Sequence, residues 1–517
     1  MSNRRDQRLR VVSLVILITL LGRIMGLGRG ILFASALGTG IEADALFAAS
    51  MLPRLFFDVI FASAVAASFI PVYTEILEHE GRTAADKLAS SFFTIVGLAA
   101  ATLTVLGMVF AAQLVGFMDV DQAASRLTAH LLAIIFPSLF FTGLAFSMVG
   151  VLNSLGQFNI PAAMSIASNG VVIIYFLFFF QRFGVYGAAV AFTIGWGAQA
   201  VMQVPSLVKR GFRYRPGFRH PGLRKIGTLM LPVMASTWAA PLNMLILLGF
   251  ASALPGGIAS LNYANDLFIM IAGLFVLSVT NVILPEMSKF SASGDRQALC
   301  GVVREATQTL LFFLIPMAIG LMILATPLIQ LLYERQQFDA HSTELTASAL
   351  AFMSLGMVGY GIQNVLLRAF YAEKRGQMPL IAGLVSVAAN VALCWLLVDA
   401  MGVAGLALAS AVSLILMALV LIPAAHQMLD GGLVSGGIVL EIGKMICAAL
   451  VMGVAVWFVR ELLTGTLSGG NLVMRLLLVG IPTAIGVTIY MGLAHVLKLD
   501  EMKVLLGYMR KKKKEGA

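Results

Sequence analysis

The chain has 517 residues and a formal net charge of +10; 59% of its residues are hydrophobic and only 12% are charged. Its mean hydropathy is +0.93, whereas soluble domains carry about 25% charged residues. A soluble globular protein is therefore excluded, and an integral membrane protein is indicated. No polar connection is long enough to fold as a separate catalytic domain, and the three widely spaced cysteines give neither a disulfide framework nor a metal-binding spacing.

Apolar segments of about 20 residues, the length that a transmembrane α-helix needs, recur between residues 11 and 496. The bilayer interior requires each such segment to satisfy its own backbone hydrogen bonds, as a helix does. We therefore predict an all-α integral membrane protein with fourteen transmembrane helices. In chain order, the predicted spans are 11–36, 45–70, 88–114, 128–152, 160–180, 185–206, 226–252, 261–284, 306–330, 345–369, 378–398, 402–422, 439–459 and 473–496.

The basic residues are distributed unevenly among the predicted loops. With fourteen spans and a cytoplasmic N-terminus, most of the 35 lysines and arginines fall on the cytoplasmic side, as the positive-inside rule requires. Both termini are thus predicted to be cytoplasmic. The basic clusters at 209–225 and 510–514 suit anionic lipid head groups. Nucleic acid is not an expected partner, because no aromatic and basic platform accompanies these clusters.

An internal repeat relates the two halves of the chain. Leu127-Thr128-Ala129 recurs 218 positions later as Leu345-Thr346-Ala347. At the same offset, Pro161 matches Pro379, Gly184 and Gly187 match Gly402 and Gly405, and Pro205 matches Pro423. Earlier in each half the offset is 214, where Phe69-Ile70-Pro71 matches Ile283-Leu284-Pro285 and Ala111 matches Ala325.

The repeat predicts three parts: an N-lobe of six spans at 1–206, a C-lobe of six spans at 207–424, and two further spans with a basic tail at 425–517. Paired halves with a binding site between them are typical of secondary transporters. The alternative is a duplication that serves folding alone.

A stretch near the N-terminus places Arg23, Arg29 and Arg54, together with Asp44, in apolar sequence. A central arginine costs roughly 2.5–3.5 kcal/mol on insertion scales unless it faces water or a partner. We predict that the three arginines line an aqueous cavity and bind an anionic substrate, since guanidinium groups match phosphate oxygens, and that Asp44 orients them. In the alternative interpretation, Asp44 caps its helix and Arg54 pairs with Asp58 at i,i+4.

Gly22, Gly26 and Gly30 repeat every four residues in the first span, a spacing that predicts close helix packing. Arg23 and Arg29 are six positions apart, and an ideal straight helix separates such positions by about 240°. We therefore predict a bend among these glycines that turns both arginines towards one cavity.

The second half carries less charge within its spans. Asp266 lies early in the eighth span, and Asn243 and Asn390 are polar positions of the seventh and eleventh. Asp58, Asp266 and the two asparagines are candidates for cavity or ion-coupling residues. Interhelical hydrogen bonding is the alternative role for both asparagines.

Four motifs carry a family resemblance: residues 21–29 (LGRIMGLGR), 43–47 (ADALF), 68–71 (SFIP) and 263–267 (YANDL). With these motifs and fourteen spans, the chain resembles over essentially its whole length the MurJ family of bacterial lipid II flippases. That family belongs to the MOP (multidrug/oligosaccharidyl-lipid/polysaccharide) exporter superfamily. The resemblance implies two six-helix lobes around a cationic cavity, a groove along the last two helices for a polyprenyl tail, and no cofactor.

For single residues, the resemblance implies substrate-binding roles for Arg23, Arg29 and Asp44. The family's double arginine of the second span falls here on Phe57 and Asp58, and we expect Arg54, one turn earlier, to substitute. The family's arginine in the eighth span is replaced by Asp266. These departures leave another polyprenyl-diphosphate-linked saccharide open as the cargo.

The expected function is movement of lipid II, the undecaprenyl-diphosphate-linked peptidoglycan precursor, from the inner to the outer leaflet of the bacterial cytoplasmic membrane by alternating access. Expected partners are lipid II, membrane lipids and the cell-wall synthesis machinery that determines cell shape. The expected energy sources are the membrane potential and Na⁺ or H⁺ coupling, because the chain has no Walker-type nucleotide loop.

Two other classes of protein remain as alternatives. A MATE-like drug or cation antiporter would use buried carboxylates, for which Asp44, Asp58 and Asp266 are candidates. A membrane-embedded transferase needs acid/base or nucleophilic groups at a membrane face. The six histidines are scattered without a catalytic spacing, so we do not expect an enzyme.

Overall fold

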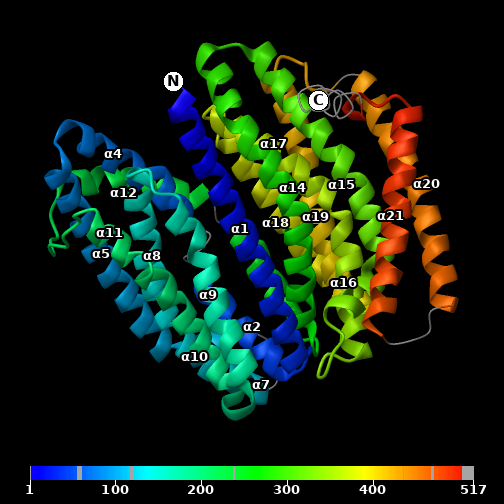
Figure 1. Ribbon diagram of the computed structural model, residues 1–517, viewed down its shortest axis with the longest axis horizontal. Coiled ribbons are helices and arrows are strands. Elements are labelled where there is room, and N and C mark those ends of the chain that lie inside the picture. Colours follow the sequence, from blue (N-terminus) through cyan, green and yellow to red (C-terminus); the bar gives the residue numbers. More distant parts are fainter. Residues whose placement is uncertain are drawn as a thin grey trace. The chain divides into compact units, whose positions relative to one another are not determined.

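The computed structural model describes residues 2–54, 61–116, 122–236, 239–434, 436–466 and 471–502, and within these ranges the regular structure is helical. The chain divides into two compact units (Figure 1). Unit 1 comprises Met1–Ala259 and Arg335–Phe338, and unit 2 comprises Ser260–Glu334 and Asp339–Ala517.

Unit 1 contains the helices that precede residue 257. In chain order they are α1 (Ser2–Leu37), α2 (Ile41–Arg54), α3 (Ala62–Ala64), the π-helix η2 (Val65–Phe69), α4 (Ile70–His79), α5 (Arg82–Val109), α6 (Ala111–Val115), α7 (Gln122–Ile135), α8 (Pro137–Ser154), α9 (Asn159–Phe178), α10 (Phe180–Val201), α11 (Val204–Lys209), α12 (Pro221–Ser236) and α13 (Ala239–Ala251).

Unit 2 contains the later helices, apart from the first turn of α14, which belongs to unit 1. They are α14 (Gly257–Ser293), α15 (Arg296–Leu332), α16 (Ala340–Leu355), α17 (Met357–Ala372), α18 (Gln377–Met401), α19 (Val403–Met428), α20 (Gly436–Thr466) and α21 (Leu472–Val496).

Eleven helices in the described part of the chain are long and apolar enough to cross a membrane, or twelve spans if α16 and α17, bent by 47°, count as one. These twelve coincide with twelve of the predicted spans, which confirms an all-α multi-pass architecture. The other two predicted spans, 45–70 and 226–252, cross residues 55–60 and 237–238, which lie outside the described ranges. The count of fourteen therefore stays a prediction.

The backbone confirms the repeat at positions where the chain turns. Gly184 and Gly402 are related by the offset of 218, and both adopt a left-handed conformation with φ of 54° and 55°. Gly156 and its counterpart Lys374 do so as well, with φ of 70° and 57°. Because left-handed conformations are uncommon in regular helical proteins outside such turns, the match means that the two halves turn at equivalent places.

Helix α1 is unbroken across the glycines at which we predict a bend, and the bend itself stays a prediction. Helical hydrogen bonding continues through the glycines from Ser2 to Leu37, and Figure 1 shows α1 as one continuous helix. The predicted close packing of these glycines is confirmed at Gly22: a Cβ there would collide with the Ser165 hydroxyl of α9, and the Asn169 side chain donates to the Gly22 carbonyl at 3.1 Å. Close contact with α9 thus holds α1 in helical form.

The compact units do not coincide with the predicted lobe boundary at residue 206. Helix α12 packs against α4, α5 and η2, and Lys225 forms an ion pair with Glu75. These contacts bring residues 207–259 into unit 1, although the repeat predicts them in the C-lobe. The boundary by packing therefore follows the α12 contacts, and the division of the sequence into three repeat-based parts stays a prediction.

Helix α15 runs unbroken from Arg296 to Leu332 although it contains Pro316 and Pro327. Proline has no N–H, so each one leaves the carbonyl four residues earlier without its helical partner. The two carbonyls are those of Phe312 and Ile323. Each requires a hydrogen-bond donor from outside α15, because an unpaired buried carbonyl costs free energy.

Helices α20 and α21, which form the terminal hairpin, supply both donors. The Tyr490 hydroxyl of α21 donates to the Phe312 carbonyl at 2.9 Å, and Nη1 of Arg460 in α20 donates to the Ile323 carbonyl at 3.0 Å. Tyr490 and Phe312 are buried in the same apolar cluster between α15 and the hairpin. The hairpin is thereby joined to α15 at the two carbonyls that α15 does not satisfy itself.

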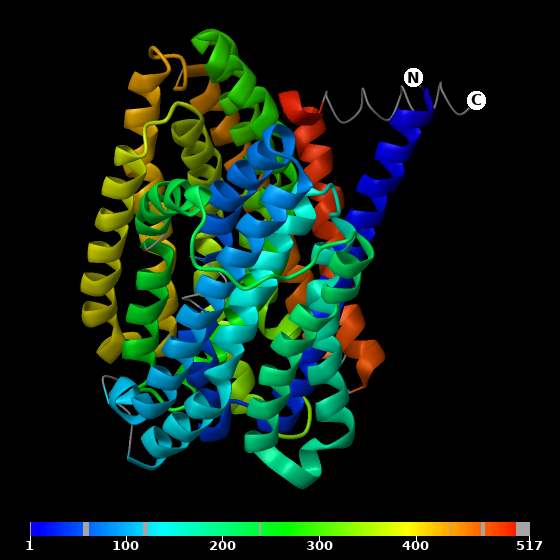
Figure 2. The same ribbon diagram turned by 90° about the vertical axis from the view of Figure 1, so that its left-hand side faces the viewer.

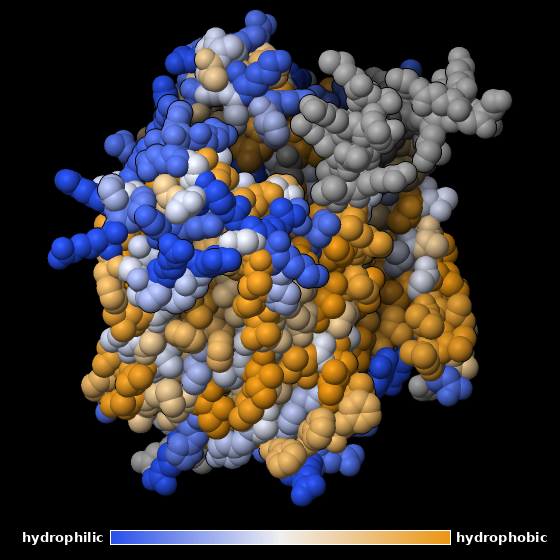
Figure 3. Space-filling model, turned by 60° about the vertical axis from the view of Figure 1, so that its left-hand side comes forward, coloured by the Kyte–Doolittle hydropathy of each residue, from blue (hydrophilic) through white to orange (hydrophobic). Residues whose placement is uncertain are grey.

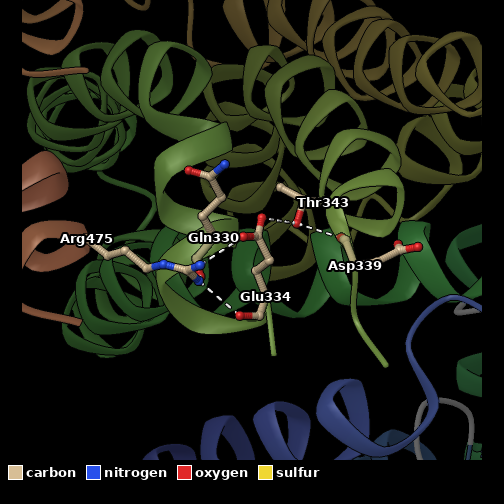
Figure 4. Close-up of polar contacts among 5 residues, drawn as sticks. All are labelled: Gln330, Glu334, Asp339, Thr343 and Arg475. Atoms are coloured by element: carbon tan, nitrogen blue, oxygen red, sulfur yellow. Dashed lines mark hydrogen bonds and ion pairs between the residues drawn. The ribbon is translucent and has the colours of Figure 1, made fainter. Parts of the chain in front are cut away.

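A third side chain of the hairpin caps the end of α15 (Figure 4). Arg475, in the first turn of α21, donates to the carbonyls of Gln330 and Glu334 at 2.7 and 3.0 Å and forms an ion pair with the Glu334 carboxylate at 2.9 Å. The other carboxylate oxygen of Glu334 accepts from the Thr343 hydroxyl at 2.9 Å. Helix ends leave carbonyls unpaired, and here a guanidinium group satisfies them.

Candidate functional site

The two arginines of α1 lie on a helix that packs against α9 through its glycine face. Both side chains are half-buried. The guanidinium of Arg29 lies over the Phe192 ring of α10, with Cζ 5.9 Å from the ring centroid. Among the described residues, no hydrogen bond or ion pair engages the Arg23 side chain. Arg23 is therefore able to accept an anionic partner without first breaking an internal ion pair.

Asp44 caps a helix, but not its own. Its Oδ2 accepts from the Gly256 N–H at 2.8 Å, and its Oδ1 accepts from the Ala259 N–H at 2.7 Å. Both N–H groups lie at the start of α14, where helices leave donors unpaired. The capping alternative is thus the geometry observed, with α14 in place of α2, and orientation of the arginines by Asp44 stays a prediction.

Of the other charged candidates of the second span, the structure describes Arg54. Arg54 is exposed at the end of α2, directly after Pro53. Asp58 lies outside the described residues, so its predicted pairing with Arg54 stays a prediction. The chain continues in α3 and then in the π-helix η2. Such π-helical turns recur at functional sites of helical proteins, which keeps this segment in the candidate site.

The candidates of the second half lie on three separate helices. Asp266 is half-buried in α14, and the described residues include no hydrogen bond or ion pair to its carboxylate. Asn243 is half-buried in α13. Asn390 is buried in α18, where its Oδ1 accepts from Cys394 Sγ at 3.6 Å. That contact is within one helix, so it neither establishes nor removes an ion-coupling role.

Sequence reasoning missed the polar residues that join the terminal hairpin to α15. It assigned no role to Arg460 or Arg475. The available signal was the pair of prolines in α15, because each implies a carbonyl that needs a donor from elsewhere. Within the described part of the chain, no three His, Cys, Asp or Glu side chains are placed to hold a metal ion.

Comparisons with known proteins agree on one family. The family model described as "Lipid II flippase MurJ" matches residues 33–478. A relative from Rhizobium tropici, named a probable lipid II flippase MurJ, is 31% identical over 410 residues, which cover 76% of each chain.

Solved structures agree with this result at the level of the fold. A structure of lipid II flippase MurJ in an inward closed conformation has a TM-score of 0.79 and 27% identity, and the match covers 95% of this chain and 99% of that one. An inward-facing MATE multidrug transporter of the MOP superfamily has a TM-score of 0.67 over 81% of this chain and 98% of that one. Its identity is 16%, so this second likeness shows the fold alone.

Proposed function

The chain belongs to the MurJ family of lipid II flippases, and from this premise we propose that it moves lipid II from the inner to the outer leaflet of the bacterial cytoplasmic membrane by alternating access. It acts as a transporter and makes or breaks no covalent bond. Both termini lie on the cytoplasmic side in this proposal, because the basic loops and the tail then obey the positive-inside rule.

The observation that carries the proposal for the site is the pair of half-buried arginines on α1. Arg23 has no ion pair within the described residues, and Arg29 is held beside the Phe192 ring. An arginine stacked on an aromatic face keeps its donors directed outward from the ring edge. The two guanidinium groups bind the lipid diphosphate, and Arg54, exposed at the end of α2, contributes a third.

An unbroken α1 changes how these arginines act. At about 240° of separation on a continuous helix, Arg23 and Arg29 do not hold one phosphate side by side. They are also nine ångströms apart along the axis in an ideal helix, from a rise of about 1.5 Å per residue. We propose that they contact the diphosphate one after the other as the site changes its access from one side to the other.

The membrane potential favours this direction of transport. With the cell interior negative, each negative charge moved outward gains about 2.3 kcal/mol per 100 mV. A diphosphate therefore has a driving force without nucleotide hydrolysis. Coupling to Na⁺ or H⁺ through Asn243 and Asn390 is a further part of the proposal, as is contact with the cell-wall synthesis machinery; replacing Na⁺ by choline and varying pH in the transport assay tests the coupling.

The experiment is reconstitution of the purified protein into liposomes with fluorescently labelled lipid II. We expect Arg23→Ala and Arg29→Ala each to slow flipping by roughly 10- to 100-fold, the value of a charge-assisted hydrogen bond of about 1.5–3 kcal/mol. Arg29→Lys keeps the charge but loses the planar fork, so it restores only part of the rate. Flipping at the parent rate in both alanine variants would refute the assignment of the site.

Arg182 offers a matched control. Its guanidinium also lies over a phenylalanine ring, that of Phe183, with Cζ 5.6 Å from the ring centroid. Unlike Arg29, Arg182 is exposed, and it lies in the first turn of α10, before the left-handed Gly184. Arg182→Ala removes the same charge and a similar ring contact, and we expect it to flip lipid II at the parent rate. A second labelled polyprenyl-diphosphate saccharide, tested in parallel, shows whether the cargo is lipid II or a related lipid, a choice raised by Asp266 in α14.

A further inference from the structure

A groove of 560 Å³ lies in unit 1 between α5, α8 and α11, away from the proposed arginine site. Its volume falls within the range of about 300–1,000 Å³ that is usual for small-molecule sites. All three helices belong to predicted membrane spans, and the lining is mostly apolar. Residues that line it include Gly97 and Leu98 of α5, Phe140 and Leu144 of α8, Leu207 of α11, and Phe212 of the connection that follows.

The connection between α11 and α12 is folded back to form one wall of this groove, and Figure 2 shows it running across α5. Phe212 is buried against the Phe93 ring, with ring centroids 5.6 Å apart. The Tyr214 hydroxyl lies 2.9 Å from Thr94 Oγ1, and the Arg215 N–H donates to Ser90 Oγ at 3.2 Å. The wall is thus held by specific contacts with α5.

The repeat shows what the equivalent face of the other half does. At the offset of 214, Gly97 and Leu98 of α5 correspond to Leu311 and Phe312 of α15. Leu311 and Phe312 are buried at 2% and 0% exposure in the cluster that α15 forms with the terminal hairpin. Leu98, in contrast, is 59% exposed. The same face of the repeated helix is therefore covered by protein in unit 2 and left open in unit 1.

Two basic residues are next to lining residues in the part of the chain that forms the connection. Lys209 follows the lining residue Val208, and Arg213 stands between the lining residues Phe212 and Tyr214. Both are exposed. In Figure 3, hydrophilic side chains gather in the upper part of the view and apolar side chains lie below them. An apolar slot with basic residues next to its lining residues is complementary to a lipid with an anionic head group.

We propose that this groove binds an anionic phospholipid of the surrounding leaflet, with an acyl chain beside Gly97 and Leu144 and the phosphate at Lys209 and Arg213. The lipid takes the place on α5 that the terminal hairpin takes on α15. Anionic lipids of the cytoplasmic leaflet attract basic segments close to the membrane surface, which accounts for the charge of the connection. This site is separate from the cargo site on α1 and does not depend on what the protein transports.

Gly97 provides a direct test. A Cβ at this position would lie 3.6 Å from Leu144 Cδ2, an ordinary contact, so Gly97→Ala is tolerated and leaves most of the groove open. Gly97→Leu extends further carbons from the same Cβ into the space beside Leu144. The full-length protein, stripped of lipid in detergent, is titrated with phosphatidylglycerol or with phosphatidylcholine of the same acyl chains, and bound lipid is measured by native mass spectrometry.

We expect the parent and Gly97→Ala to retain phosphatidylglycerol in preference to phosphatidylcholine, and Gly97→Leu to lose that retention several-fold. Lys209→Gln and Arg213→Gln should each weaken phosphatidylglycerol binding by about fivefold. Arg219→Gln with Arg224→Gln removes one exposed charge of the connection and one of the first turn of α12, neither of them next to a lining residue, and this pair should leave binding unchanged. An equal loss in that control pair, or equal retention of the two lipids by the parent, would overturn the proposal.

A second measurement on the parent protein avoids any effect of substitutions on folding. Phosphatidylglycerol that carries a diazirine on its acyl chain is incorporated into liposomes with the protein and activated by light. Cross-linked peptides should come from α5 around Leu98 and from α8 around Leu144. Cross-links spread evenly over lipid-facing helices, or confined to a second protein copy on this face, would contradict the proposal.

Discussion

Helices α5 and α15 are the same element of the repeat, but they differ in length and in what packs against them. Helix α5 ends at Val109, where Phe110 leaves the helical conformation, and the chain restarts in the short α6. Helix α15 does not end at the equivalent position. It is 37 residues long and continues to Leu332, although it contains Pro316 and Pro327.

The difference lies in what covers each helix. Helix α15 packs against α20 and α21, whose side chains bond to the carbonyls that the two prolines leave unpaired. On the equivalent face of α5, Leu98 is exposed. The comparison indicates that the terminal hairpin is a structural partner of α15, because its hydrogen bonds permit a proline-containing helix of this length.

The largest effect on this comparison should come from Arg475. Arg475→Ala leaves the carbonyls of Gln330 and Glu334 and one carboxylate oxygen of Glu334 without their donor. We expect a loss of about 3 kcal/mol in the free energy of unfolding, the upper end for hydrogen bonds to charged groups, measured by chemical unfolding in detergent. Arg475→Lys should recover part of this loss because it keeps a positive charge and N–H donors. The recovery should be incomplete because an ammonium group lacks the planar fork of a guanidinium.

A matched control for Arg475 is Arg296 at the other end of α15. Arg296 pairs with Asp430 at 3.0 Å, but the two side chains are 47% and 63% exposed. Exposed ion pairs contribute about 0–1 kcal/mol, so Arg296→Ala should change stability little. Equal free energies of unfolding for the two alanine variants would show that the Arg475 cap stabilises the protein no more than an exposed ion pair does.

A double-mutant cycle at Tyr490 tests the role of the prolines. Tyr490→Phe removes the donor to the buried Phe312 carbonyl, and we expect a loss of about 2 kcal/mol. Pro316→Ala restores an N–H that pairs with Phe312 within α15. In the Pro316→Ala background, Tyr490→Phe should therefore cost much less.

The cycle separates hydrogen bonding from packing. A phenylalanine keeps the ring of Tyr490 in its apolar cluster, so only the hydroxyl changes. Equal losses from Tyr490→Phe with and without Pro316 would show that the bond to Phe312 is not what α15 requires. The pair of Arg460 and Pro327 gives the same cycle at the Ile323 carbonyl, where a guanidinium is the donor.

Much of this architecture was accessible from sequence because it depends on properties that repeat along the chain. Apolar length predicts spans, and eleven of them are confirmed, or twelve if the bent pair α16 and α17 counts as one. Paired glycines at an offset of 218 predict equivalent turns, and Gly184 and Gly402 have nearly the same φ. The glycine spacing of α1 also predicts close packing, which the position of Ser165 on α9 confirms at Gly22, whereas the bend among these glycines stays a prediction.

The candidate site was harder to predict because it depends on contacts between distant segments. Asp44 bonds to Gly256 and Ala259, more than 200 positions away, and nothing local to its helix indicates that partner. Tyr490 and Phe312 present the same difficulty. Proline marks a carbonyl that needs a donor, but it does not say which helix supplies one.

A smaller effect should separate the repeated glycines Gly187 and Gly405. A Cβ on Gly405 would lie 2.5 Å from the Leu397 carbonyl oxygen, which is backbone, whereas a Cβ on Gly187 would meet only side-chain atoms, the terminal hydroxyl of Tyr175 and, at 2.7 Å, the Cβ of Phe183. A side-chain end moves more readily than a backbone carbonyl. We expect Gly405→Ala to destabilise the protein by about 1 kcal/mol more than Gly187→Ala, at the low end for overpacking. Equal unfolding free energies would mean that both sites relax alike.

The smallest effect concerns Asp339, which caps α16 by accepting from the Ser342 N–H at 2.8 Å. This bond holds the pKa of Asp339 below its usual value of 3.8, so the carboxylate stabilises the folded state above that pH, and the stabilisation is lost as pH falls through the lowered pKa. Asp339→Ala should cost about 0.5–1 kcal/mol at neutral pH, the lower part of the range for caps, because the side chain is exposed. Asp339→Asn keeps an acceptor but no charge. The stability difference between the parent and this variant should therefore shrink on acidification. A difference that stays constant with pH would show that the cap acts through its geometry alone.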